Sequence, residues 1–351
     1  MYGLKQASLE FREEIEALLA VSTSDKLLDE FDCVLAEKYS DEIKRSDGDE
    51  LVYMGLVIKR APNGDVFVSQ PAYYQKLVKE YAADFDLTEA EIHGKPPRYP
   101  MQATTVTCEG DDDEISSTKY RGIIGALNHL ALMTRPDISF ALSVLASKCR
   151  CPTYGDLRRV KHLFRFVIAT KHIGLNFKRD GDFQLYVYAD ASYASRGETR
   201  SQSGYAFTLG LGNAAFYVKS TKQQLVTLSS TEAEYVAMFH SVTEAVFLKR
   251  LLEQLGFDQD PIPVFQDNTS TIQWAQGKEN FHRVKHLSVK YHYVRELLKE
   301  RVIAVEYLST IEMIADVLTK PLVNEQFEYL ASGLLGIYSF DKRTECERFS
   351  R

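Results

Sequence analysis

The sequence has few cysteines and no long apolar run, and each of these absences excludes a class of protein. Its five cysteines are widely spread, at Cys33, Cys108, Cys149, Cys151 and Cys346. Because the one close Cys-x-Cys pair has no second pair, neither a zinc site nor a disulfide framework is indicated. No apolar stretch approaches the roughly 20 residues of a membrane helix, and the first residues lack the apolar region of a secretory signal. We therefore expect an intracellular protein, cytoplasmic or nuclear, with no membrane partner.

The composition is ordinary for a globular chain, but the charge is unevenly distributed. A length of 351 residues predicts about two domains, and 45% hydrophobic with 26% charged residues excludes global disorder. The net charge of −7 taken alone argues against a nucleic-acid partner. However, residues 1–60 hold 8 Lys/Arg and 14 Asp/Glu, a net −6, whereas residues 148–181 hold 9 and 2, a net +7. Because local patches matter for binding, the overall charge does not exclude nucleic acid.

The first half of the chain shows helical periodicity and one hairpin signal. Two β-rich runs, Leu51–Arg60 and Asp65–Gln70, are joined by a turn that contains Asn63-Gly64. Helices are predicted at Leu9–Leu19, Lys26–Tyr39, Tyr73–Ala83, Tyr120–Met133, Ile138–Lys148 and Asp156–Thr170, with a loop over His93–Ser117.

The pattern changes from about Asp182. Phe183–Ala189 is a continuous apolar and aromatic run, as expected for a strand that is buried on both faces. Further strands are predicted at Gly204–Leu209, Ala214–Lys219, Gln224–Leu228, Pro263–Gln266 and Ile303–Tyr307, and helices at Ser229–Leu255, Leu287–Leu298 and Ile314–Leu318. This order predicts an α/β or α+β sheet with mixed strand directions.

Four acids in the second half stand out by their position. Asp190 and Asp267 lie at the ends of predicted strands, and Glu234 and Asp316 lie in the first turns of predicted helices. A buried, unpaired carboxylate is costly, and Mg²⁺ prefers oxygen ligands. Two such ions about 3.5–4 Å apart can activate a water and stabilise the leaving oxygen of a phosphodiester. The four acids are therefore candidate metal ligands.

Each of these acids also has a structural alternative. Asp190 could cap a turn, Asp267 could form an Asx turn or a helix cap, and Asp316 could interact with a helix dipole. Glu232 fits a capping box with Ser229. Glu234 differs from Glu232, because it heads a largely apolar helical stripe that is expected to face the sheet. From position alone, both kinds of role stay open for these acids.

Six short motifs follow one another in the second half. They are Tyr188-Ala-Asp190-Ala-Ser192, Lys219-Ser-Thr-Lys-Gln223, Leu228-Ser-Ser-Thr-Glu-Ala-Glu-Tyr235, Asp267-Asn268, Arg283-Val-Lys-His286 and Ala315-Asp-Val-Leu-Thr-Lys-Pro-Leu322. Over about residues 182–330 this series resembles the ribonuclease H domain that ends the Pol polyprotein of Ty1/copia-type retrotransposons.

This resemblance implies a fold, an activity and a site. The implied fold is α/β and ribonuclease H-like, with a five-stranded mixed sheet of three antiparallel and then two parallel strands flanked by helices. The implied activity is endonucleolytic cleavage of the RNA strand of RNA–DNA hybrids with two Mg²⁺ ions, for which Mn²⁺ can substitute. Carried over position by position, the catalytic and metal-binding acids are Asp190, Glu234, Asp267 and Asp316. The sequence departs from the usual family residues at Ser192, Val218 and Ser288, and none of these departures removes a ligand.

Residues 1–178 resemble the later part of the reverse transcriptase region of the same polyproteins, namely the end of the palm with the thumb and connection. The matching motifs are Tyr2-Gly-Leu-Lys-Gln-Ala7, Met54-Gly55-Leu56, Ser69-Gln70-x-x-Tyr73, Gly125-x-Leu127 and Thr134-Arg-Pro-Asp-Ile138. The Tyr-x-Asp-Asp hairpin that holds two polymerase acids is expected near Ala20–Ser22, where the sequence lacks it, and the fingers would precede residue 1. We therefore expect a truncated α+β remnant without polymerase activity. Residues 338–351 are predicted to be a disordered tail.

Basic residues in both halves are candidates for contacts with an RNA–DNA hybrid, because phosphate contacts supply much of the affinity for nucleic acid. They are Arg135, Arg158, Arg159, Lys161, Arg165, Lys219, Lys222, Arg283 and Lys285. The alternative for the basic helix is a solvated charged face. The alternative for the whole chain is a catalytically silent, nucleic-acid-binding or degenerate remnant, which the lost polymerase motif favours and the retained acids oppose. The sequence makes no prediction of oligomeric state.

Overall fold

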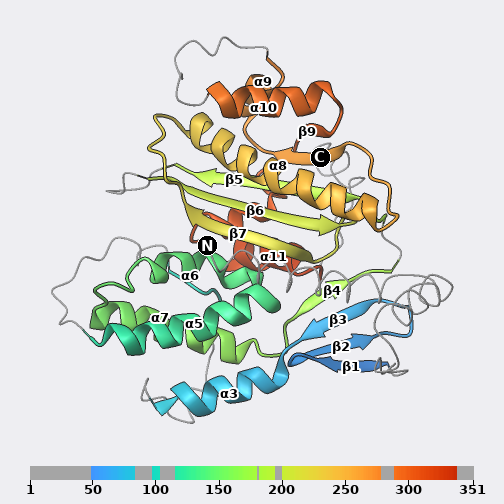
Figure 1. Ribbon diagram of the computed structural model, residues 1–351. Coiled ribbons are helices and arrows are strands. Elements are labelled where there is room, and N and C mark those ends of the chain that lie inside the picture. The colour runs from blue at the N-terminus through green and yellow to red at the C-terminus, as the bar shows by residue number, and fades with distance from the viewer. Residues whose placement is uncertain are drawn as a thin grey trace, which may run out of the picture.

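The computed structural model contains two β-sheets with helices packed around them (Figure 1). It describes residues 49–83, 97–102, 115–179, 182–193, 200–277 and 288–337. The helices expected over 9–19 and 26–39 and the expected tail over 338–351 lie outside these residues. Within the part that is described, no helix is both long and apolar enough to cross a membrane.

The first sheet is antiparallel and has the strand order β1-β2-β3-β4. Its strands are β1 Glu50–Tyr53, β2 Leu56–Arg60, β3 Val66–Ser69 and β4 Leu175–Phe177. The single strand predicted over 51–60 is wrong, because Met54 and Gly55 have φ angles of 48° and 83° and turn the chain between β1 and β2. The turn predicted at Asn63-Gly64 is confirmed. It joins β2 to β3, with Gly64 at φ 88°.

A helical layer lies between β3 and β4 in the chain. Its elements are α3 Pro71–Tyr81, α5 Ser117–Met133, the 3₁₀ helix η3 Pro136–Ile138, α6 Ser139–Ala146 and α7 Tyr154–Ala169. The periodic apolar residues of α5 and α7, such as Leu127 and Leu163, are fully buried in one core. Helix α7 begins at a capping box in which the side chains of Thr153 and Asp156 accept each other's backbone N–H.

The second sheet has the strand order β7-β6-β5-β8-β9. Its strands are β5 Leu185–Ser192, β6 Gln202–Leu209, β7 Ala215–Lys222, β8 Ile262–Gln266 and β9 Ile303–Tyr307. Strands β5, β6 and β7 pair antiparallel, whereas β8 and β9 run parallel to β5. The strand predicted over 224–228 is wrong. The chain leaves the sheet after Lys222, and Leu225, Val226 and Leu228 are exposed in the irregular segment before the next helix.

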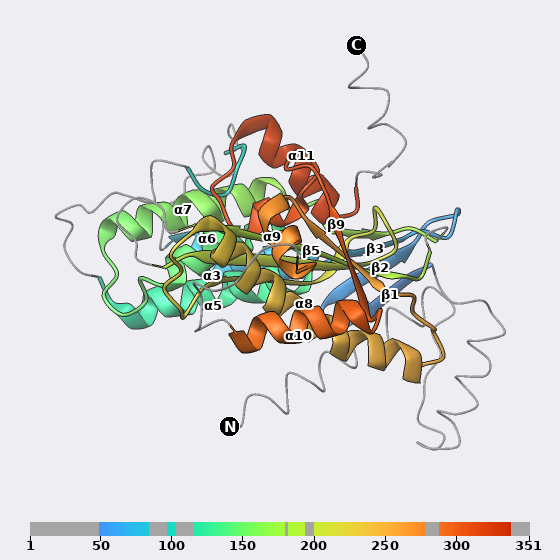
Figure 2. The same ribbon diagram turned by 90° about the horizontal axis from the view of Figure 1, so that it is seen from above.

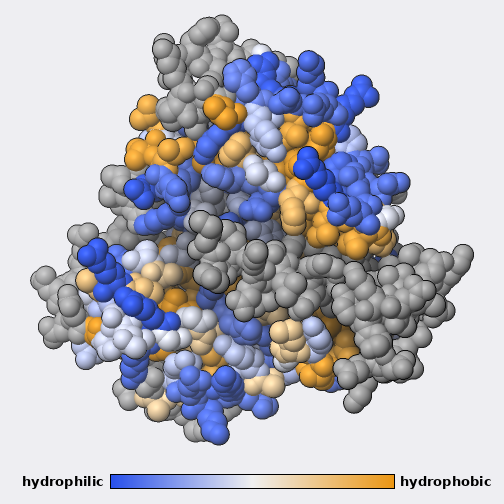
Figure 3. All heavy atoms as spheres, viewed as in Figure 1, coloured by the Kyte–Doolittle hydropathy of each residue, from blue (hydrophilic) through white to orange (hydrophobic). Residues whose placement is uncertain are grey.

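Helices cover both faces of this sheet (Figures 1 and 2). The long helix α8 Ser230–Gln254 and α10 Ser288–Lys299 lie on one face, with α9 Thr269–Ala275 beside them, and the 3₁₀ helix η5 Ile314–Leu318 and α11 Asn324–Leu334 lie on the other. Alternate residues of β5 enter the two cores, with Val187 facing α8 and Tyr188 facing η5 and α11. The expectation that this strand is buried on both faces is confirmed. Hydrophilic side chains predominate over α10 and mix with apolar ones over α8 (Figure 3).

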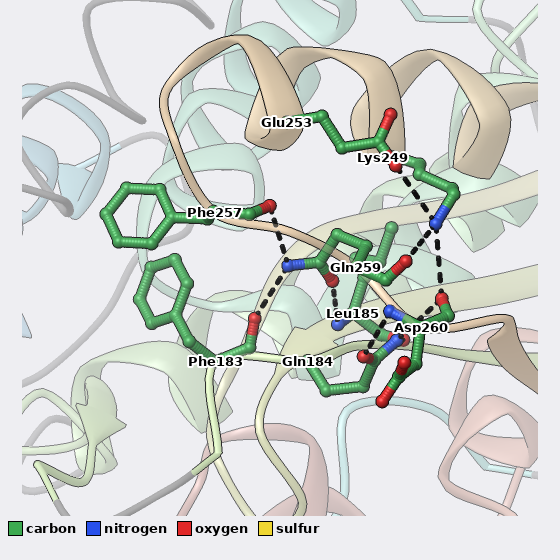
Figure 4. A network of polar contacts seen from close by, with 8 residues as sticks. All are labelled: Phe183, Gln184, Leu185, Lys249, Glu253, Phe257, Gln259 and Asp260. Carbon is green, nitrogen blue, oxygen red and sulfur yellow. Dashed lines mark hydrogen bonds and ion pairs between the residues drawn. The ribbon is translucent and has the colours of Figure 1, made fainter.

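One buried glutamine fastens the start of β5. The Oε1 atom of Gln259 accepts a hydrogen bond from the backbone N–H of Leu185 at 2.8 Å, and its Nε2 donates to the carbonyl of Phe183 at 3.0 Å (Figure 4). The ammonium of Lys249 on α8 donates to the backbone carbonyl of Gln259. These contacts fix the sheet at the end opposite Asp190, which lies near the other end of β5.

Helix α11, which the sequence did not predict, joins the two halves of the chain. The ring of its Phe327 packs edge-on against the ring of Phe166 on α7, with the ring centroids 5.8 Å apart. In β4, Asn176 donates its N–H to Leu335 and accepts from the N–H of Ala214. One apolar core therefore contains residues of α5, α6 and α7 together with residues of η5 and α11.

Candidate metal centre

Asp190 and Asp267 are positioned by two neighbouring parallel strands. In the pairing of β5 with β8, Tyr188 lies opposite Phe265, and each acid follows its strand residue by two positions. Because the carboxyl ends of parallel strands meet at the same edge of a sheet, the two carboxylates emerge together. Asp190 is 1% exposed, whereas Asp267 is partly exposed.

Glu234 and Asp316 reach this edge from helices on opposite faces of the sheet. Glu234 lies near the start of α8, and its Oε2 accepts hydrogen bonds from the N–H of Ala191 at 2.9 Å and from Nε2 of Gln266 at 2.8 Å. Asp316 lies in η5. One carboxylate oxygen from each of Asp190, Asp267 and Asp316 lies within 4.8 Å of the others. The structure therefore gathers three of the predicted acids and holds Glu234 beside them through Ala191 and Gln266.

Residues near Asp267 and Glu234 take the capping roles at the starts of α9 and α8. Asn268, not Asp267, caps α9, since its Oδ1 accepts from the N–H of Thr271 at 3.2 Å. Asp267 instead accepts from the hydroxyl of Thr310 at 2.8 Å. Glu232 does have a capping role, but its carboxylate accepts from the N–H of Leu228 at 2.7 Å, one residue before the cap. Asp267 and Glu234 are thus left to face the cluster.

Two residues of the site were not singled out from the sequence. The ammonium of Lys320 lies 2.8 Å from Oδ1 of Asp316 and 3.7 Å from Oδ2 of Asp190. The hydroxyl of Thr319 donates to Oδ2 of Asp190. The i,i+4 spacing of Asp316 and Lys320 is a signal for an ion pair, but the contact of either residue with Asp190 depends on the tertiary fold.

Burial and mutual repulsion raise the pKa of the clustered carboxyl groups. Burial is the main cause of the raised pKa of Glu234, and the charges of Asp190 and Asp267 add to it. Burial and the charge of Asp190 also raise the pKa of Asp267, and they raise that of Asp316 to about 8. Burial alone would lower the pKa of Lys320, but Asp190 and Asp316 outweigh this effect and raise it. The cluster therefore favours the binding of positive charge.

The donor set fits a hard divalent cation. Oδ2 of Asp316 is buried and has no hydrogen-bond donor among the described residues, and Oδ1 has only the ion pair with Lys320. A buried carboxylate oxygen without a partner is costly, and a metal ion would satisfy it. All the candidate ligands are carboxylate oxygens, which suit Mg²⁺ and Mn²⁺ better than softer metals.

The prediction that Arg135 contacts nucleic acid is wrong. Its side chain is fully buried, and its guanidinium donates to both carboxylate oxygens of Asp137 at 2.9 and 2.8 Å. It also donates to the hydroxyl of Tyr74 and to the carbonyl of Thr170, and it lies over the ring of Phe166. A buried guanidinium needs partners on every side, so Arg135 holds α3, η3 and α7 together and has no surface for phosphate.

The other basic candidates differ in their exposure. On α7, Arg158 is exposed, Lys161 and Arg165 are partly buried, and Arg159 pairs with Asp156 at 2.8 Å. On β7, Lys219 is exposed and lies 3.9 Å from Glu244, and Lys222 is partly buried. Arg283 and Lys285 lie outside the described residues. Apart from Arg135, the assignment of these residues to nucleic-acid binding stays a prediction.

The strand order, the strand directions and the acidic edge define a ribonuclease H-like α/β fold. The solved structure of LC11-RNase H1 in complex with an RNA/DNA hybrid aligns with 39% of this chain and 94% of its own, with 18% identity and a TM-score of 0.31. No protein-family model matches the chain.

Two curated relatives extend the comparison. The retrovirus-related Pol polyprotein from transposon RE1 of Arabidopsis thaliana is 31% identical over 300 residues, which are 84% of this chain and 20% of that protein. Secreted RxLR effector protein 161 of Plasmopara viticola is 38% identical over 135 residues, which are 38% of this chain and 94% of that protein. The chain belongs to the family of Pol polyproteins of Ty1/copia-type retrotransposons. The chain spans about a fifth of the length of the RE1 relative. The matched region covers both halves of the chain.

Proposed function

We propose that this protein hydrolyses the RNA strand of RNA–DNA hybrids, with Asp190, Glu234, Asp267 and Asp316 holding two Mg²⁺ ions. The observation that carries the proposal is the convergence of four acids, from two strand ends and two helices, on one edge of a ribonuclease H-like sheet. Like charges held this close destabilise one another, since the charge of Asp190 raises the pKa of the other three acids, and bound cations would relieve this repulsion.

The residues around the acids have positioning roles in this proposal. Gln266 and the N–H of Ala191 hold one oxygen of Glu234, and Thr319 and Thr310 hold one oxygen each of Asp190 and Asp267. These bonds leave the other oxygens of the three side chains for ligation. When bound, Mg²⁺ supplies a Lewis acid and a means of activating water for attack on a phosphodiester.

The hybrid itself would be held by basic residues outside the acidic edge. Among the described candidates, Arg158 and Lys219 are exposed, and Arg159, Lys161, Arg165 and Lys222 are partly exposed. Contacts of this kind supply affinity in a salt-dependent manner and carry no base specificity. We also infer that this chain lacks polymerase activity, because its 351 residues contain no Tyr-x-Asp-Asp motif. A primer-extension assay tests that inference, and extension by the purified chain would refute it.

Cleavage of a labelled hybrid in Mg²⁺ tests the proposed activity. We expect the wild-type chain to cleave the RNA strand and Asp190→Asn to lose cleavage by about 10³-fold or more, since each metal ligand contributes several kcal/mol to transition-state stabilisation. No difference between the two proteins would refute the enzymatic function. Hybrid binding without cleavage by the wild type would favour the silent nucleic-acid-binding remnant.

Two acids on α8 offer a matched pair for the same assay. Glu234 faces the cluster, whereas Glu232 accepts from the N–H of Leu228 at the start of the helix. We expect Glu234→Gln to abolish cleavage. Glu232→Gln should keep it, because a glutamine oxygen can still accept the same hydrogen bond. Equal losses in the two variants would show that the assay reports damage to α8 and not loss of a ligand.

A further inference from the structure

Lys320 places a positive charge inside the cluster of acids. Its ammonium lies 2.8 Å from Oδ1 of Asp316 and 3.7 Å from Oδ2 of Asp190, and both of these carboxylates are 1% exposed. The Lys320 side chain is 33% exposed, so it contacts both the cluster and solvent. These two carboxylates belong to the triad whose oxygens approach one another within 4.8 Å.

The backbone that carries Lys320 is held firmly against the sheet. The N–H of Lys320 donates to the carbonyl of Asp316 at 3.1 Å, which closes the turn after η5. The hydroxyl of Ser220 on β7 donates to the carbonyl of Leu318 at 2.6 Å, and Thr319 donates to Asp190. The start of the side chain is therefore fixed, whereas its four-carbon stem keeps the freedom to move the ammonium.

The ammonium of Lys320 and a divalent cation would compete for the same pair of carboxylates. Oδ1 of Asp316 and Oδ2 of Asp190 contact Lys320, and two cations within a few ångströms repel strongly where water is scarce. In the metal-free protein, Lys320 compensates part of the negative charge that would otherwise destabilise the cluster. A metal ion bound at the other oxygens of Asp190 and Asp316 would lie next to this ammonium, so its binding would drive the ammonium away by charge repulsion.

We propose that Lys320 is an internal counter-cation of the Asp190–Asp316 pair, which a divalent cation displaces, and that it thereby weakens the affinity of this chain for Mg²⁺. This inference rests on the metal site of the proposed function. The ammonium acts on the metal through the carboxylates, so Lys320 is a positioning residue of the site. In the loaded site, its stem swings the ammonium outward, toward the solvent that it already meets.

Calorimetric titration of the full chain with Mg²⁺, without nucleic acid, tests this role. Lys320→Met keeps the length of the stem and removes the charge, and Lys320→Arg keeps the charge as the matched control. We expect Lys320→Met to bind Mg²⁺ on the order of tenfold more tightly than wild type, because a competing charge has been removed. Lys320→Arg should remain within about twofold of wild type, because the competing charge is kept. A purely structural ion pair would lower the thermal stability of the metal-free Lys320→Met protein and leave its Mg²⁺ affinity unchanged.

The outcomes separate this inference from the proposed function. If wild type binds Mg²⁺ and Lys320→Met binds it equally or more weakly, the role of Lys320 is refuted and the metal site stands. If neither protein binds Mg²⁺, the metal site fails and the inference fails with it. If Lys320→Met is unfolded without metal, Lys320→Gln, which keeps a polar tip, is judged by the same criterion.

Discussion

Gly204 lies directly across the β5–β6 pair from Asp190. A Cβ atom at Gly204 would lie 2.5 Å from Cγ2 of Thr319, 2.7 Å from Cβ of Leu318 and 3.1 Å from the carbonyl oxygen of Ala315. The missing side chain therefore makes the space in which η5 and Thr319 pack against the sheet beside Asp190. One glycine, distant in sequence from three of the four acids, allows the acidic edge to form.

Adding even one methyl group at Gly204 should disturb both the stability of the protein and the acidic site. We expect Gly204→Ala to destabilise the protein by about 1–3 kcal/mol, as overpacking of a tight core does, and to lower hybrid cleavage by displacing Thr319 and Asp316. Chemical denaturation and the cleavage assay measure the two effects. Gly125→Ala is the control, because a Cβ there meets nothing within 4 Å on the exposed side of α5. Comparable effects of both substitutions would contradict the role of Gly204.

The raised pKa of Asp316 predicts how the stability of the metal-free protein depends on pH. An ordinary Asp has a pKa near 3.8, whereas burial and Asp190 raise that of folded Asp316 to about 8. Between these values the folded state holds a proton that the unfolded state has lost. The contribution of Asp316 to the free energy of unfolding therefore falls as pH rises from about 4 to about 8.

Asp316→Asn isolates this contribution. We expect the variant to lose less stability than wild type between pH 5 and pH 8 in the presence of a chelator, because it has no carboxyl group to ionise at this position. Urea denaturation at a series of pH values measures the difference, in which the histidines common to both proteins cancel. Parallel stability profiles would contradict the prediction.

Breaking the buried ion pair of Arg135 and Asp137 should lower the stability of the protein. It should not change how the folded protein binds nucleic acid. Arg135→Met leaves Asp137 buried without its partner, and breaking a buried ion pair in this way costs about 3–5 kcal/mol. Thermal denaturation measures this loss. At a temperature where the variant is folded, the salt dependence of hybrid binding should equal that of wild type.

Arg158→Gln is the informative comparison for that experiment, since Arg158 is exposed on the same half of the chain. If the proposed phosphate contact exists, this variant should keep its stability and show a salt slope that is smaller by about one unit. A smaller slope for Arg135→Met instead would restore Arg135 as a contact residue.

The core shared through α11 predicts that the two halves unfold together. Phe327 is 5% exposed in this core and meets Phe166, and Phe→Ala substitutions in cores cost about 3–5 kcal/mol. The fluorescence of Trp274, the single tryptophan, reports on the second half, and far-ultraviolet circular dichroism reports on the whole chain. We expect coincident unfolding transitions in both signals, and Phe327→Ala should shift both equally. Survival of the second half after rapid proteolysis of the first would contradict this prediction.

Local chemistry determined much of what the sequence predicted. The apolar run that became β5, the amphipathic helices and the Asn63-Gly64 turn depend on neighbouring residues, so their patterns identified them. The four acids could be found because strand ends and helix starts are visible in the sequence. The structure places one carboxylate oxygen from each of Asp190, Asp267 and Asp316 within 4.8 Å of the others and brings Glu234 beside them.

Tertiary contacts decided the rest. The run at 224–228 has the composition of a strand, yet the chain leaves the sheet after Lys222, so these residues stay outside it. Arg135 looked like a surface cation, but the positions of Tyr74 and Phe166, far from it in the chain, enclose it. Lys320 enters the acidic cluster because the fold brings η5 against Gly204 and Asp190. The sequence alone determined which residues carry charge and where the chain can form strands and helices. Only the tertiary structure decided which charges are buried together, because burial and proximity depend on segments that are distant in the sequence.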